Sequence, residues 1–179
     1  MEVYDAIRTV LAVRAYKDKP VPQEIILRIV EAARLTASSM NGQPWHFIIV
    51  KEPDTLKKLG ALVRSGPYIA QAPLAIVVAM EKSIYAVSDA SRAIQSMILT
   101  DWSERVASNW VGFENLTAVK PLLGIPDHID EPCPESKGNH SCRFFREDIK
   151  PVRGERGTTG ATSAAAALHW ELCTGPGRR

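Results

Sequence analysis

Apolar residues near the start of the chain recur at helical spacing. Between residues 3 and 11 they fall on one face of a helix, and between residues 22 and 35 they form a longer stripe. Pro22 suits the first turn of the second helix, because its fixed φ is helical and its missing N–H costs no intrahelical bond. The pattern therefore predicts two amphipathic helices ahead of the first strand.

Farther along, strand-like and helix-like patterns alternate. The apolar run at 74–80 does not alternate with polar residues, which predicts a strand buried on both faces. The full pattern predicts strands at 46–50 and 74–80, helices at 55–63, 86–106 and 116–123, and a short strand or turn at 108–113. We therefore expect an α+β fold in which helices flank a mixed sheet of about four strands.

Composition narrows the class of protein. The chain has 179 residues, of which 45% are hydrophobic, enough for one domain with a substantial core. Its 22 basic and 20 acidic residues form no basic block, so we expect no nucleic-acid partner. The apolar runs are far shorter than the roughly 20 residues of a membrane span, and the N-terminus does not resemble a signal peptide. These observations predict a cytoplasmic protein without a membrane partner.

The last third of the chain differs from the rest. Helical and strand periodicity is lost after about residue 130, so we expect a domain over residues 1–130 and an atypical, poorly ordered tail over residues 131–179. All three cysteines lie in this tail, and an odd number argues against a disulfide scaffold. Cys133, His140 and Cys142 could bind zinc, but their spacing matches no standard zinc knuckle, so we expect no metal site.

The segment at 38–47 is the most informative part of the chain. Its sequence is Ser-Ser-Met-Asn-Gly-Gln-Pro-Trp-His-Phe, which places two hydroxyls and two carboxamides in six residues ahead of a strand. Such groups donate to and accept from a flat heteroaromatic ring without imposing a charge on it. The alternative is an ordinary polar loop capped by a buried Trp45. His46 belongs to the strand, and we interpret it as a packed or surface histidine rather than a catalytic base.

The order of several motifs adds a resemblance to a known family. Residues 37–50 resemble the signature loop and first core strand of the nitroreductase family. The stretches 7–22, 72–78, 89–102 and 108–126 resemble further parts of the same family in the same order, so the likeness covers roughly residues 2–129. It implies a homodimeric oxidoreductase that binds FMN, uses NAD(P)H as co-substrate, and reduces nitroaromatic, quinone or similar small acceptors by a ping-pong mechanism.

The same resemblance implies six residues that bind FMN. They are Arg14, Ser38, Ser39, Asn41, Val111 and Gly112. The arginine corresponds to a basic residue that holds the phosphate, a role that suits the planar fork of a guanidinium. The three loop residues correspond to contacts reached from the neighbouring subunit, and the last two to backbone that approaches the ring. The resemblance nominates no side chain as an essential acid or base.

The chain also departs from the family pattern. Where family members commonly have basic and hydroxyl residues that add donors to the phosphate, this chain has Val10-Leu11-Ala12. The proline that family members have after the second helix is replaced by Ala37, and the apolar strand and basic element expected after Pro126 are not recognisable. These departures leave open an alternative, a non-catalytic dimeric scaffold of the same fold in which FMN binding is weak or lost.

Overall fold

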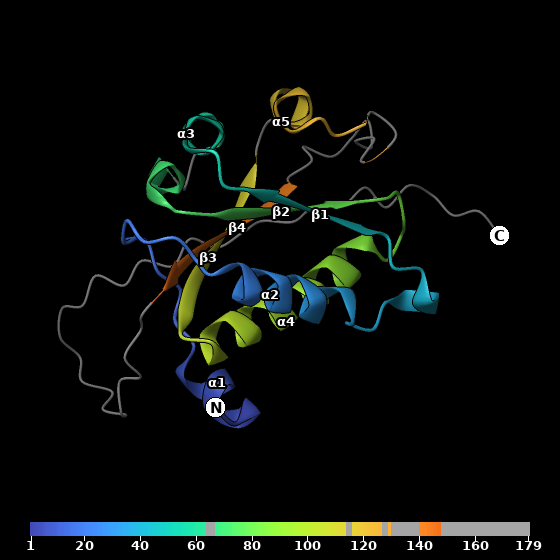
Figure 1. Cartoon of the computed structure of the whole chain (residues 1–179). Coiled ribbons are helices and arrows are strands. Elements are labelled where there is room, and N and C mark those ends of the chain that lie inside the picture. The colour runs from blue at the N-terminus through green and yellow to red at the C-terminus, as the bar shows by residue number, and fades with distance from the viewer. Residues whose placement is uncertain (64–66, 114–115, 127–128, 130–139, 148–179) are drawn as a thin grey trace.

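The computed structural model describes residues 1–63, 67–113, 116–126, 129 and 140–147 (Figure 1). The helices are α1 (Val3–Thr9), α2 (Gln23–Arg34), α3 (Pro53–Ala61), α4 (Ala86–Ser103) and α5 (Leu116–Leu123). The strands are β1 (Trp45–Val50), β2 (Ala75–Met80), β3 (Val106–Phe113) and β4 (His140–Glu147), and two short 3₁₀ turns are η1 (Ser39–Asn41) and η2 (Pro67–Gln71). Every helix and strand expected from the sequence is present, with ends that differ by a few residues.

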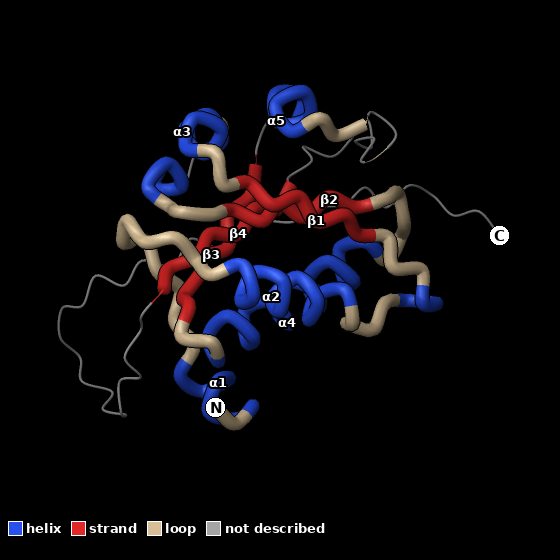
Figure 2. The backbone as a smooth tube through the Cα atoms, in the orientation of Figure 1, coloured by secondary structure: helices blue, strands red, loops and turns tan. Residues whose placement is uncertain are grey.

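The four strands form one sheet in the order β1-β2-β4-β3. Helices α2 and α4 lie against one face of the sheet, and α3 and α5 lie on the other, as Figure 2 shows. The α+β fold with a helix-flanked sheet is therefore confirmed. All pairings among the described strands are antiparallel, so the parallel pairing that a mixed sheet requires is not found within these ranges.

Strand β4 was not expected from the sequence. It comes from the segment assigned to an atypical tail, yet it pairs with β2 on one side and with β3 on the other. Its sequence, His-Ser-Cys-Arg-Phe-Phe-Arg-Glu, lacks the apolar run that revealed β2, and only the pairing with two neighbours identifies it. The remainder of 131–179, with Cys133, lies outside the described residues, so the poor order expected there stays a prediction.

Two turns set the ends of the later elements. Helix α4 ends at Ser103, short of the expected Val106, because Arg105 adopts a left-handed conformation with φ of 61° and the chain then enters β3. Helix α5 ends as expected just before Gly124, whose φ of 66° suits a residue without a Cβ atom.

Strand β2 forms the centre of the core. All six of its residues are buried, which confirms the expectation of a strand covered on both faces. Ile76 and Val78 pack toward the cluster that includes residues of α2 and α4, whereas Ala75 and Val77 pack toward the cluster that includes residues of α3. The period-two alternation of the strand thus supplies both layers of helices with apolar contacts. No helix within the described ranges is long and apolar enough to cross a membrane.

The burial of β2 gives a prediction for stability. Ile76 is 0% exposed, whereas Ile49 on the edge strand β1 is 37% exposed. Replacing Ile76 with alanine should lower the free energy of unfolding by about 2–5 kcal/mol, because the change removes buried methyl groups and leaves a cavity. Ile49→Ala is the matched control and should cost about 1 kcal/mol or less. Chemical denaturation of both variants measures the difference, and equal losses would contradict the burial described here.

Candidate functional site

The polar loop between α2 and β1 is anchored to the start of α4. The backbone N–H of Ser39 donates to Oδ1 of Asp89 at 3.0 Å, and the Ser39 hydroxyl donates to the same oxygen at 2.9 Å. Asp89 is only 1% exposed and lies in the first turn of α4, where the positive end of the helix dipole favours a carboxylate. Arg92 lies 3.7 Å from the same oxygen. The buried acid therefore fixes the position of the loop.

The backbone of this loop is strained. Met40, Asn41 and Gln43 have φ values of 54°, 53° and 46°, which is the left-handed region that residues with a side chain rarely occupy. The Ser38 hydroxyl accepts a hydrogen bond of 2.9 Å from the Gln43 backbone N–H and so closes the turn. Strained backbone that is held by specific hydrogen bonds is typical of ligand-binding segments.

The tip of the loop presents neutral polar groups. Asn41 and Gln43 are exposed, and the Gln43 amide lies 3.5 Å from Oδ1 of Asn41. Ser38 accepts a hydrogen bond through its hydroxyl oxygen and so keeps a proton to donate. This set of donors and acceptors carries no charge, so it fits the heteroaromatic ring expected from the sequence.

A second polar cluster lies along β3. The segment that carries Arg14 runs beside this strand, because the backbone N–H of Val13 donates to the Ser108 carbonyl at 3.3 Å. The amide nitrogen of Asn109 donates to the Tyr68 hydroxyl at 3.2 Å. Burial raises the pKa of the Tyr68 hydroxyl, while the charge and hydrogen bonding of Arg14 and the hydrogen bond from Asn109 oppose this shift. Arg14 therefore lies next to the pair formed by Tyr68 and Asn109.

The remaining two expected residues continue the same strand. Val111 is fully buried in the core cluster that packs under α3, and Gly112 follows it in β3. Val111 therefore turns its side chain into the core, and its backbone is the part that remains for a ligand. The structure thus places the segment that carries Arg14 along β3, and whether these residues bind FMN stays a prediction.

One chain does not bring all six expected residues together. In Figure 1 the loop that contains η1 lies at the right-hand end of the molecule, whereas the blue segment between α1 and α2, which carries Arg14, lies at the left-hand end. The candidate residues thus form two half-sites. The uncharged half-site comprises residues 38–43, and the basic half-site comprises Arg14, Tyr68, Asn109 and the end of β3.

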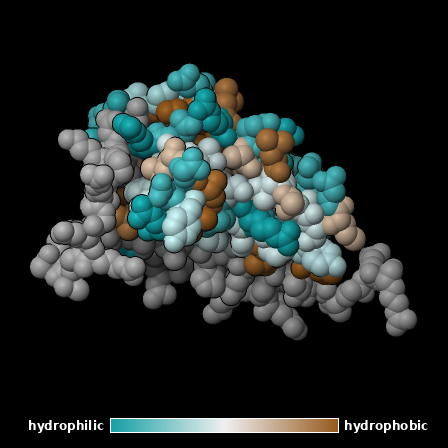
Figure 3. Space-filling model, turned by 90° about the horizontal axis from the view of Figure 1, so that it is seen from below, coloured by the Kyte–Doolittle hydropathy of each residue, from teal (hydrophilic) through white to brown (hydrophobic). Residues whose placement is uncertain are grey.

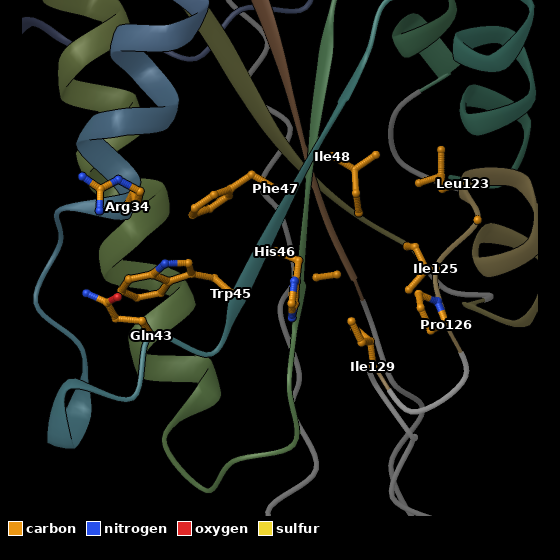
Figure 4. Close-up of a pocket in the computed structure, with 12 residues that line it drawn as sticks. Arg34, Gln43, Trp45, His46, Phe47, Ile48, Leu123, Ile125, Pro126 and Ile129 are labelled. Atoms are coloured by element: carbon orange, nitrogen blue, oxygen red, sulfur yellow. The ribbon is translucent and has the colours of Figure 1, made fainter.

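A cavity of about 660 Å³ lies at the outer edge of β1 and extends to both faces of this strand. Figure 4 shows Arg34, Gln43, Trp45 and Phe47 on one side of this strand, and Ile48 with residues that follow α5 on the other. Its lining is mainly apolar. His46 lies in the cavity and pairs with exposed Glu81 at 3.3 Å, in agreement with its interpretation as a surface residue. The sequence does not predict that these residues lie close together, because their proximity depends on how the turn after α5 packs against β1.

The chain thus has an α+β fold with an uncharged polar loop at one end of the molecule and a basic half-site at the other, and these two groups are its candidate ligand-binding residues. Comparison with known proteins identifies the class. The profile of the nitroreductase family matches residues 8–84. A protein of Methanothermobacter thermautotrophicus to which NADH dehydrogenase/NAD(P)H nitroreductase activity is ascribed is 32% identical over 138 residues, which cover 72% of each chain. An FMN reductase (NAD(P)H) of Bacillus subtilis is 37% identical over 73 residues, which cover 41% of this chain and 29% of that protein.

The fold comparison agrees with the sequence comparison. A nitroreductase-type protein of Desulfovibrio desulfuricans, whose crystal structure contains FMN, superposes with a TM-score of 0.73 at 21% identity and covers 88% of this chain and 92% of its own. The chain therefore belongs to the nitroreductase family. The resemblance seen in the sequence is confirmed, and so, at the level of the family, are the oxidoreductase class and the cofactor FMN.

The contacts of Asp89 give a prediction for the loop. Asp89→Ala should lower the free energy of unfolding by about 2–4 kcal/mol, because both hydrogen bonds from Ser39 to a charged acceptor are lost. Asp54→Ala is the matched control, since Asp54 also lies in the first turn of a helix but is exposed and pairs with exposed Lys57. That control should change the stability by about 0.5 kcal/mol or less. Thermal or chemical unfolding measures both, and an unchanged Asp89→Ala variant would refute the anchoring role.

Proposed function

We propose that the chain is a homodimeric, FMN-dependent oxidoreductase that takes electrons from NAD(P)H and passes them to nitroaromatic, quinone or similar small acceptors. The observation that carries this proposal is the uncharged loop at 38–43, which is strained and fixed by Asp89. The names of the relatives, an NAD(P)H nitroreductase and an FMN reductase, support the choice of cofactor and co-substrate.

The separation of the half-sites supports the dimer. One chain holds the uncharged loop and the basic cluster at opposite ends, so a complete site combines the loop of one subunit with the cluster of another. Apolar side chains are exposed on the side of α1, α2 and α4, and Figure 3 shows brown residues among teal ones on this face. The most exposed of them include Val3, Tyr4, Ile7, Leu27 and Leu35. A second subunit that covers them would remove apolar surface from water.

The side chains of this chain bind and orient rather than transfer protons. Arg14 would hold the phosphate of FMN, and Ser38, Ser39 and Asn41 would contact the ring, with the backbone at Val111 and Gly112 on the ring's other side. The bound flavin supplies the two-electron chemistry. We propose a ping-pong order, in which oxidised nicotinamide leaves before the acceptor enters the same pocket. No side chain of the described site is assigned as an essential acid or base.

Cofactor binding tests this function. Addition of FMN should raise the melting temperature of the purified protein, because a ligand that binds only the native state stabilises it. The shift should shrink strongly in Arg14→Gln, which removes a charge-assisted donor to the phosphate. Arg8→Gln is the matched control, because Arg8 is an exposed arginine of α1 that pairs with Asp5. A colourless wild-type protein that shows no shift with FMN would instead support the non-catalytic scaffold.

Mixed dimers test whether each site is shared. Arg14→Gln and Asn41→Ala homodimers should both bind FMN poorly, because every site carries one defect. Random re-association of the two variants makes half of the dimers mixed, and each mixed dimer then has one intact site, so about a quarter of the wild-type binding capacity should return. FMN fluorescence titration before and after mixing measures this recovery. No recovery would place the arginine and the loop of a site in the same subunit.

A further inference from the structure

Tyr68 is the residue of the basic half-site that the sequence did not single out. Its hydroxyl accepts a hydrogen bond of 3.2 Å from the amide nitrogen of Asn109 and also interacts with the side chain of Arg14. Its ring packs near that of Tyr16, with centroids 6.4 Å apart and planes inclined by 30°. The aromatic contact and the hydrogen bond together fix where the hydroxyl points.

Asn109 holds this hydroxyl from inside the protein. Asn109 is 1% exposed, and its Oδ1 atom is buried without a hydrogen-bond partner. A buried acceptor without a partner is costly, so the arrangement is not what stability alone would favour. The nitrogen of the Asn109 side chain thus donates a hydrogen bond to Tyr68, whereas its oxygen has no hydrogen-bond partner.

The hydrogen-bonding capacity of a phenol decides what Tyr68 can do. A hydroxyl has two acceptor lone pairs and one proton to donate. Asn109 and Arg14 are both donors toward it, so they occupy its acceptor capacity and leave the proton for a third group. A phenol keeps its proton at neutral pH, and burial raises the pKa of Tyr68 further, so the hydroxyl would not repel an anion. Beside a guanidinium, the third group is best an anionic oxygen.

We propose that Tyr68 donates a hydrogen bond to the phosphate of FMN, next to Arg14. This inference rests on the proposed function, and it concerns how the cofactor is recognised rather than whether the chain is an enzyme. It also accounts for a departure from the family pattern, because Val10-Leu11-Ala12 offers no side-chain donor to the phosphate. Tyr68 would supply a neutral donor in place of one of the missing groups.

The affinities for FMN and riboflavin, which differ by the phosphate, test the proposal. Tyr68→Phe removes only the hydroxyl and should weaken FMN binding about tenfold, equivalent to about 1.4 kcal/mol, while riboflavin binding stays unchanged. Tyr16→Phe is the matched control, because it removes a hydroxyl from the neighbouring ring whose hydrogen bond goes to the Val13 carbonyl. This control should leave the ratio of the two affinities as in the wild type. Isothermal titration calorimetry measures both ligands with each variant.

Three other outcomes would contradict the proposal, and a second variant serves if Tyr68→Phe does not fold. Equal losses of FMN and riboflavin binding in Tyr68→Phe would show a structural role and refute phosphate recognition, as would unchanged FMN binding. A wild-type protein that binds neither flavin would refute the proposed function itself, and this inference with it. If Tyr68→Phe does not fold, Asn109→Leu decides, because it keeps the hydroxyl but removes the group that orients it. An intermediate drop in the ratio of FMN to riboflavin affinity is then expected, and an unchanged ratio overturns the proposal.

Discussion

The link between Asp89 and Ser39 is the interaction on which the candidate site depends. A loop with three left-handed residues other than glycine is unfavourable by itself, and two hydrogen bonds to a buried carboxylate hold it in place. Because that carboxylate lies in the first turn of the longest helix, the position of the loop is coupled to the core under the sheet. The loop can therefore present amides and hydroxyls to a ligand while its backbone stays fixed.

The second constraint is the distance between the two half-sites. The loop precedes β1 at one end of the sheet, and Arg14 lies beside β3 at the other, so one chain carries two complementary halves without joining them. This arrangement makes assembly part of the proposed function, because a second copy of the chain would place its loop opposite the basic half-site of the first. A subunit contact would also bury the apolar residues of α1 that are exposed in one chain.

The proposed phosphate site departs from the family pattern at residues 10–12. Apolar residues at 10–12 remove charged donors, yet the structure places a tyrosine beside the remaining arginine and orients it with a buried asparagine. A neutral donor contributes less than a charged one, so the chain would hold its cofactor more loosely than a relative with several basic residues.

The sequence by itself determined every described helix, three of the four described strands and the chemistry of the loop. Apolar periodicity gave α1, α2, α4 and β2, because burial of one or both faces imposes a period that can be read along the chain. The order of motifs gave the family. Only the tertiary structure decided that β4 lies between β2 and β3, that Asp89 holds the loop, and that Tyr68 and Asn109 meet beside Arg14. These contacts join residues far apart in the chain, and periodicity, which describes only local order, carries no information about them.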